Sequence, residues 1–160
     1  MGTRSGDIDP GVLLFVIEER RMTSQAVNKL INKESGLLGV SGTSEDMQDL
    51  LDRESTDPRA AEAVQLFCYR AKKYLGAYAA ALGGLDILVF TGGIGEHAAS
   101  IRERVCSCLE FLGIKIDAGR NRENAPVISS EESRVAVRVV RTDEDLMIAR
   151  HTKKLISRGR

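Results

Sequence analysis

An apolar run that leads straight into a glycine-rich turn constrains the fold of this chain more than any other feature. Asp86-Ile87-Leu88-Val89-Phe90 is nearly continuous in apolar residues, which is typical of a strand buried on both faces. The turn that follows is Thr91-Gly92-Gly93-Ile94-Gly95-Glu96, and we predict that it opens a helix ending near Leu112-Gly113. A strand, a glycine turn and a helix in succession indicate an α/β fold.

Helix signals dominate the first half of the chain. Asp-Pro pairs at 9–10 and 57–58 each supply an N-cap and a proline at the first helical position. The second of these helices is expected to end near Leu82, before Gly83-Gly84. Ser24 is the expected cap of one shorter helix, and Thr43 or Ser44 of another. Between them, the segment 35–44 has three glycines and four hydroxyl residues, and it is predicted to be a loop.

The second half offers few further strands. The valines between 135 and 140 predict the last strand, Thr142 is the expected cap of a final helix, and Ile114 and Ile116 suggest a short strand. A buried sheet usually has about 5–6 strands. The chain is therefore expected to be an incomplete domain, or to receive strands from a second chain.

The glycine turn is a candidate phosphate site. Gly92, Gly93 and Gly95 lack Cβ atoms, so the backbone N–H groups can approach a ligand closely, and the start of a helix favours anions. The pattern is neither the dinucleotide fingerprint nor the P-loop, because the Lys-Ser/Thr ending is missing. A plain tight turn is the alternative.

A second polar constellation, Thr142-Asp143-Glu144-Asp145, follows the last strand. Ligands of parallel sheets bind at the carboxyl ends of strands, and a carboxylate beside a phosphate turn suits Mg²⁺. Alternatively, these residues only favour the helix dipole, with Thr142 and Asp145 as an approximate capping box. Arg4 lies in a polar stretch expected to be flexible, where it is either solvated or a bidentate partner for a phosphoryl group.

Charge and cysteine content exclude several classes of partner. Lys+Arg and Asp+Glu are both 23, which gives no electrostatic reason to expect nucleic acid or an anionic membrane. No apolar run approaches the roughly 20 residues of a membrane-spanning helix, and no signal-peptide segment is recognisable. Three cysteines, an odd number, argue for reduced thiols and a cytoplasmic location, and Cys106-x-Cys108 is too sparse for a metal site.

Four ordered motifs resemble the acetate kinase family, with its related propionate and butyrate kinases. They are Met1–Pro10 (MGTRSGDIDP), 35–42 (SGLLGVSG), 89–96 (VFTGGIGE) and 142–146 (TDEDL). The resemblance implies a partial RNase H-like fold of the actin/Hsp70/sugar-kinase type, with residues 1–160 as the C-terminal nucleotide-binding domain. It also implies reversible transfer of the γ-phosphoryl group of ATP to acetate, which gives ADP and acetyl phosphate and requires Mg²⁺.

The resemblance assigns roles residue by residue. Arg4 matches the arginine that stabilises the transferring phosphoryl group, and Glu144 matches the magnesium-associated glutamate. The tripeptide at the adenosine is matched by Asp46, Met47 and Gln48. The ATP-contacting loop is matched by Gly93, Ile94, Gly95, Glu96 and His97. These roles suit phosphoryl transfer, which depends on positioning and charge neutralisation.

Three departures from the family shape the functional expectation. Gln48 stands where the family usually has Arg, and His97 where it usually has Asn. The family chain is also considerably longer, and the part expected before Met1 would supply the acetate pocket, the remaining catalytic Asn, Arg, Asp and His, a phosphate-binding loop and early strands. We therefore expect a fragment that is inactive alone and that forms a homodimer or joins a complementing N-terminal half. A non-catalytic nucleotide-binding or interaction module is the alternative, favoured by Gln48 and His97.

Overall fold

The structure is a computed structural model that describes residues 1–158. It divides into two compact units, Met1–Ala77 and Tyr78–Arg160, and each is described by itself. The expected assignment of residues 1–160 to one nucleotide-binding domain stays a prediction.

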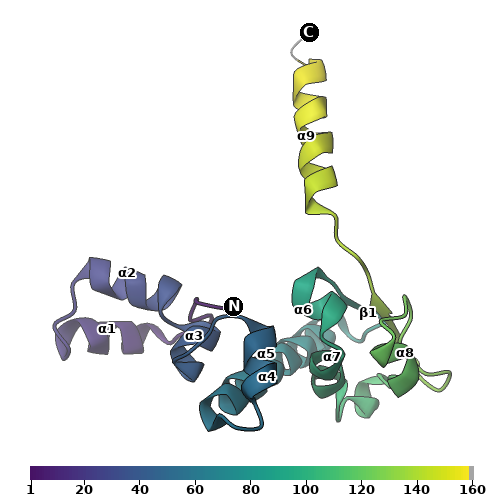
Figure 1. Cartoon of the computed structure of the whole chain (residues 1–160), viewed down its shortest axis with the longest axis horizontal. Coiled ribbons are helices and arrows are strands. Elements are labelled where there is room, and N and C mark those ends of the chain that lie inside the picture. Colours follow the sequence, from purple (N-terminus) through teal and green to yellow (C-terminus); the bar gives the residue numbers. More distant parts are fainter. Residues whose placement is uncertain (159–160) are drawn as a thin grey trace. The chain divides into compact units, whose positions relative to one another are not determined.

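The described elements of the first unit are helical (Figure 1). They are α1 (Pro10–Glu18), α2 (Ser24–Lys33), α3 (Gly36–Ser41), α4 (Met47–Arg53) and α5 (Pro58–Leu82), which continues into the second unit. The core of this unit is formed by apolar side chains of four helices: Val27, Leu37, Met47, Leu50, Ala60, Ala63, Val64 and Cys68.

Two helix caps differ from the predicted ones by one to three residues. The hydroxyl of Thr23, not Ser24, accepts from the Ala26 N–H at 3.2 Å at the start of α2. Asp46 caps α4, and its carboxylate accepts from the N–H groups of Gln48 at 2.7 Å and Asp49 at 3.3 Å. The side chain that caps a helix is the one immediately before the first helical residue, and several hydroxyl or carboxyl residues compete for that place here.

The prediction of a loop at 35–44 is wrong, because Gly36–Ser41 forms α3. Ser35 makes no side-chain cap for this helix. Instead, the N–H groups of Leu37 and Leu38 donate to the carbonyl oxygens of Met1 at 3.3 Å and Gly2 at 2.9 Å. Backbone carbonyls of a remote segment thus satisfy N–H groups that a helix start leaves unpaired, and local sequence gives no sign of this.

The second unit contains a two-stranded parallel sheet with short helices (Figure 1). Its strands are β1 (Ile87–Phe90) and β2 (Ala136–Val139), paired in register from Ile87↔Ala136 to Phe90↔Val139. Its helices are α6 (Gly92–His97), α7 (Ala99–Cys106), α8 (Ala118–Arg122) and α9 (Glu144–Arg158), with a 3-10 turn at Glu110–Leu112. The α/β class and the small, incomplete sheet are as predicted. Ile114 and Ile116 do not form a named strand, since Ile116 makes only an isolated antiparallel bridge to Ser129.

Strand β1 is not buried on both faces, contrary to the prediction. Ile87 and Val89 are 52% and 48% exposed, whereas Val137 in β2 is fully buried. The apolar run is therefore typical of a strand covered on both faces, but no element of residues 1–158 covers the face with Ile87 and Val89.

The single helix predicted from the glycine turn to Leu112 is broken at Ala98. This residue has φ −96° and ψ 81°, and it separates α6 from α7. The carbonyl oxygens of Gly95 and Glu96, which a continuous helix would use for its own hydrogen bonds, accept from the guanidinium of Arg102 at 2.8 and 3.0 Å. The side chain of Arg102, six to seven residues further along the chain, thus binds the carbonyls at the end of α6, where residues 96–98 include no glycine or proline.

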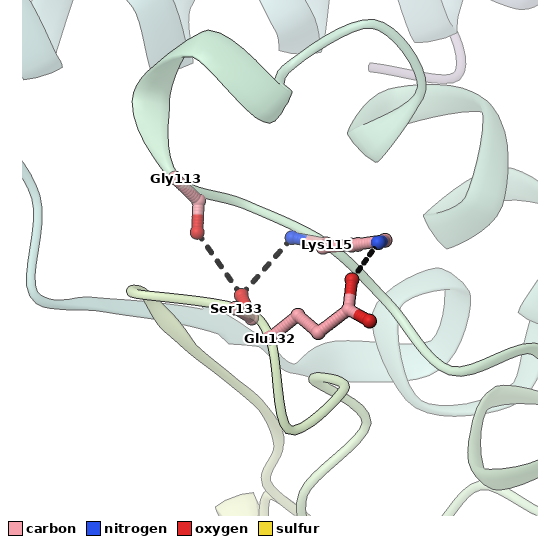
Figure 2. A network of polar contacts seen from close by, with 4 residues as sticks. All are labelled: Gly113, Lys115, Glu132 and Ser133. Carbon is pink, nitrogen blue, oxygen red and sulfur yellow. Dashed lines mark hydrogen bonds and ion pairs between the residues drawn. The ribbon is translucent and has the colours of Figure 1, made fainter.

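The segment after the 3-10 turn is tied to the loop before β2 by the network that Figure 2 shows. The Ser133 hydroxyl donates to the Gly113 carbonyl oxygen at 3.0 Å and accepts from the Lys115 N–H at 3.0 Å. Lys115 also pairs with Glu132. These contacts fix the approach of the chain to β2, whose carboxyl end carries the second candidate loop.

The cysteines agree with the sequence expectation. Cys68 and Cys106 are buried, Cys108 is exposed, and no disulfide joins any of the three. Among residues 1–158, no helix combines the length and apolarity needed to cross a bilayer.

Candidate functional site

The carboxyl ends of β1 and β2 lie side by side, because the two strands are parallel. The pairing extends one residue beyond β2, since the Val140 N–H donates to the Phe90 carbonyl oxygen at 2.9 Å. The glycine turn follows one strand and the segment 140–143 follows the other, so both predicted loops meet at one edge of the sheet.

Glu96 joins these two loops through a single carboxylate oxygen. Its Oε1 accepts from the Gly92 N–H at 3.0 Å, the Thr142 N–H at 2.9 Å and the Thr142 hydroxyl at 2.8 Å. The prediction that Thr142 caps α9 is therefore wrong. Asp143 takes that place, and its carboxylate accepts from the Leu146 N–H at 2.8 Å.

The hydrogen bonds to Glu96 hold its carboxyl group in the charged form. Bonds from Thr142, followed by the Gly92 N–H and the nearby His97, lower the pKa of Glu96 from its ordinary value, while burial acts in the opposite direction. The residue is only 8% exposed. Because its Oε1 already has three donors, Glu96 acts here as a tie between loops.

This tie gives the second unit an acid-sensitive contribution to stability. Since the pKa of Glu96 is lower in the folded chain than its ordinary value of 4.5, the stabilisation is complete above that value and is lost as pH falls through the folded pKa. We expect Glu96→Gln to lower the midpoint of urea unfolding at pH 7, and the difference from the parent to shrink as pH falls from about 5 to 3. Urea unfolding, monitored by amide exchange of residues 136–142, measures the difference between the two midpoints.

The exposed carboxyl of Glu110 provides the control, because Glu110→Gln removes one negative charge without touching the tie. A pH-independent difference between the parent and Glu96→Gln would contradict the assignment.

Arg102, which the sequence analysis missed, is fully buried beneath the glycine turn. Its Nη1 donates to the carbonyl oxygens of Gly95 and Glu96 at 2.8 and 3.0 Å. Its Nε and Nη2 donate to the Oδ1 and O atoms of Asn121 at 2.8 and 2.7 Å, and Nη2 also donates to Oδ1 of Asn124 at 2.6 Å. Burial lowers the pKa of Arg102, because loss of water disfavours the charged form.

The glycines of the turn differ in what surrounds them. Gly92 has φ +71°, the left-handed conformation that favours glycine. A Cβ atom at Gly93 would meet nothing within 4 Å, whereas one at Gly95 would lie 3.2 Å from the carbonyl carbon of Phe90. The Gly92 N–H is bound to Glu96. In the first turn of α6, the N–H groups of Gly93 and Ile94 can therefore bind a ligand.

The segment that carries Arg4 is anchored, contrary to the expected flexibility. The Ser5 N–H donates to Ile31 O at 2.8 Å, and the Ser35 N–H donates to Thr3 O at 2.9 Å. From α5, the guanidinium of Arg70 donates to the carbonyl oxygens of Ser5 at 2.6 Å and Asp7 at 2.8 Å. Arg4 itself is exposed, so an exposed side chain stands on a backbone that is held on both sides.

The predicted adenosine tripeptide has structural contacts of its own. Asp46 caps α4, Met47 is buried in the core, and Nε2 of Gln48 donates to Oδ1 of Asp52 at 2.8 Å. These residues and Arg4 belong to the first unit, whereas residues 93–97 and Glu144 belong to the second. Their roles at a nucleotide stay predictions.

Glu144, the predicted magnesium residue, is exposed at the first position of α9. Residues 1–158 contain no group of three or more His, Cys, Asp or Glu side chains placed to hold a metal ion. A single carboxylate still fits Mg²⁺, which keeps several waters and is commonly held by one or two carboxylates together with substrate phosphates.

The strand–turn–helix, its parallel partner strand and the surrounding helices define part of an RNase H-like α/β fold, and comparison with solved structures confirms this class. The acetate kinase of Porphyromonas gingivalis matches with a TM-score of 0.89 and 49% identity over 98% of this chain and 40% of that one. A propionate kinase from Francisella tularensis matches with a TM-score of 0.86 and 39% identity over 93% of this chain and 38% of that one.

The chain belongs to the Acetokinase family, whose family model matches residues 1–150. The acetate kinase of Rhodopseudomonas palustris is 53% identical over 162 aligned residues, which cover 100% of this chain. The same alignment covers 40% of that relative, so the chain spans well under half the length of the curated proteins it matches.

Proposed function

We propose that this chain is the nucleotide-binding component of an acetate kinase-type phosphotransferase, which transfers a phosphoryl group between ATP and acetate to form ADP and acetyl phosphate. Family membership supports the reaction class. The structural observation that carries the proposal is the Glu96 tie, which holds the glycine turn beside the strand end that leads to Glu144. A phosphate-binding turn and a carboxylate for Mg²⁺ at one sheet edge are two of the parts that phosphoryl transfer uses.

The proposed roles follow the predicted sites. The N–H groups of residues 93–94 contact the nucleotide phosphates, and residues 46–48 contact the adenosine. Arg4 neutralises charge on the transferring phosphoryl group, as a guanidinium suits planar phosphoryl oxygens. Glu144 would hold Mg²⁺, which supplies charge neutralisation on the phosphates when bound. The odd number of cysteines, three, supports a reducing, cytoplasmic location.

An acetyl-hydroxamate assay tests the proposal. We expect the 160-residue chain alone to form no measurable acetyl phosphate from ATP and acetate in the presence of Mg²⁺, because the chain spans 40% of its relatives' length and the resemblance assigns the acetate pocket to the rest. Adding the remaining portion of the R. palustris relative is expected to produce acetyl phosphate. ATP- and Mg²⁺-dependent turnover by the pure chain would contradict the first expectation.

The alternative, a non-catalytic nucleotide-binding module, has its own signature in the same assay. Gln48 supports it, since this amide replaces an expected cation and is bonded to Asp52. The module would be favoured by a chain that binds ADP but shows no turnover after the missing half is added. Neither Gln48→Arg nor His97→Asn would then restore turnover.

We also propose self-association, for which the first helix offers an apolar surface. Every residue of α1 is at least partly exposed, and Leu14 and Phe15 are 57% and 53% exposed. Apolar surface of this kind favours pairing. We expect light scattering at micromolar concentration to give a mass above that of the monomer, and the double change Leu14→Ser with Phe15→Ser to lower it.

The neighbouring exposed residue Glu19 provides the control, since Glu19→Ser leaves the apolar side chains in place. A monomeric parent would contradict the expectation, and partners other than a second copy, above all the complementing half, would then cover α1.

A further inference from the structure

We propose that Arg102 is the positioning residue that holds the glycine turn in the shape required to bind nucleotide phosphates. The inference rests on the proposed function of residues 93–94. Arg102 is fully buried, so it acts through the backbone of the turn and not by contact with a ligand.

The hydrogen bonds of Arg102 determine where the turn points. Its Nη1 binds the carbonyl oxygens of Gly95 and Glu96, which lie at the C-terminal end of the six-residue α6. Carbonyl and N–H groups of a helical turn point to opposite ends of the axis. Anchoring the carbonyls therefore orients the N–H groups of Gly93 and Ile94 at the other end, toward the edge of the sheet.

The anchor is itself rigid, because Arg102 bridges α6 to α8. Asn121 accepts from Arg102 through both its side chain and its backbone, and its Nδ2 donates to the Ala99 carbonyl oxygen at 2.9 Å. Asn124 accepts the remaining Nη2 bond. All five N–H groups of the guanidinium are thus directed at named oxygens, and a lysine could not reproduce this fork.

The chemistry of the network argues against a purely packing role. The five acceptors are amide and carbonyl oxygens, so no hydrogen-bonded carboxylate cancels the buried charge. Burying such a charge is unfavourable unless its hydrogen bonds are satisfied. An apolar residue in this space would leave these oxygens without their donor, whereas a guanidinium fastens two consecutive carbonyls of the turn and two asparagines at once.

The two ends of the turn are fastened by two different side chains. Glu96 holds the N–H of Gly92 and the segment at Thr142, and Arg102 holds the carbonyls of Gly95 and Glu96. Between these fixed points stand Gly93 and Ile94, the residues proposed to meet phosphate.

The test compares Arg102→Lys, which keeps the charge but loses the fork, with Arg122→Met as a matched control that removes an exposed arginine of α8. Amide exchange of the full chain without nucleotide is measured first. We expect Arg102→Lys to speed exchange at residues 95–97, whose N–H groups bond within α6, by about tenfold or more while β2 stays protected. We expect Arg122→Met to match the parent.

Binding is then measured by NMR titration with Mg²⁺ and ADP and, separately, with adenosine. We expect Arg102→Lys to weaken ADP binding by about tenfold, the scale of one charge-assisted hydrogen bond, and to leave adenosine binding unchanged. General destabilisation would lower both affinities together, so the ratio isolates the positioning role.

A milder variant keeps the test decisive if Arg102→Lys does not fold. Asn124 has φ +52°, so Asn124→Gly fits the backbone and removes only one acceptor of Arg102; we expect faster exchange at residues 95–97. Parent-like exchange at the turn in the folded variants, or ADP affinity equal to the parent's, overturns the proposal. A parent that binds adenosine but not ADP overturns the proposed function of the turn itself, and the Arg102 inference falls with it.

Discussion

We expect the parent chain to bind ADP weakly, in the millimolar range, and the replacement of Gly93 with Val to abolish this binding. A Cβ atom at this position would meet nothing within 4 Å beyond its chain neighbours and the backbone of its own helix, so the added Cβ atom does not displace the turn. The branched side chain would instead occupy the space through which a phosphate reaches the N–H groups of residues 93–94. Calorimetry or NMR titration with Mg²⁺ and ADP measures the loss, and Gly93→Ala is expected to give an intermediate affinity.

Gly95→Val, which the sequence alone suggests equally, is a less informative change. Its Cβ atom would lie 3.2 Å from the Phe90 carbonyl carbon, so lost binding in that variant would also follow from a displaced turn. The assignment of the turn to phosphate is contradicted if folded Gly93→Val binds ADP as tightly as the parent. The turn would then serve only to reverse the chain between β1 and α6.

Patterns local in sequence predicted the elements that position this site. The apolar run at 86–90 and the glycines after it predicted β1 and the turn, and the valines at 135–140 predicted β2 and its parallel carboxyl end. Both are short-range signals, namely β propensity, the punctuation by glycine and the burial pattern. They sufficed to place the glycine turn beside the segment 142–144.

The contacts that hold the site together could not be predicted, because they join residues distant in the chain. Glu96 reaches Thr142, 46 residues away, and Arg102 reaches Asn121, 19 residues away. Thr142 before an acidic segment reads as a helix cap, and Arg102 in a polar helix reads as a solvated cation. Only the three-dimensional arrangement shows that the first binds Glu96 and that the second is buried.

The exposed apolar surfaces have a different explanation. Ile87 and Val89 of β1 are suited to burial, yet about half of each is exposed, and Leu146 and Leu155 of α9 are 43% and 72% exposed. The relatives are much longer than this chain. The prediction of burial on both faces therefore fails for residues 1–158, which span 40% of the length of these relatives.

Replacing Gly36 with Ala is expected to lower the free energy of unfolding of the first unit by about 2–5 kcal/mol, the sum of a left-handed backbone penalty and steric overpacking. Gly36 has φ +63°, and a Cβ atom there would lie 2.5 Å from Met1 O and 2.9 Å from the carbonyl oxygens of Gly2 and Arg4. These oxygens belong to the segment that carries Arg4. The clash therefore falls on backbone, which cannot rotate away as a flexible side chain can.

Urea unfolding measures the loss, and amide exchange shows where it acts. The Ser35 and Leu38 N–H groups, which donate to Thr3 O and Gly2 O, should lose protection first, because relief of the clash separates the Arg4 segment from α3. Gly76 provides the matched control: a Cβ atom there meets nothing within 4 Å, and Gly76→Ala in the interior of α5 should stabilise the unit by about 0.5–1 kcal/mol. Equal unfolding midpoints for Gly36→Ala and the parent would show that this segment is not held against α3, and Arg4 would then lack the fixed backbone on which its proposed role at the phosphoryl group depends.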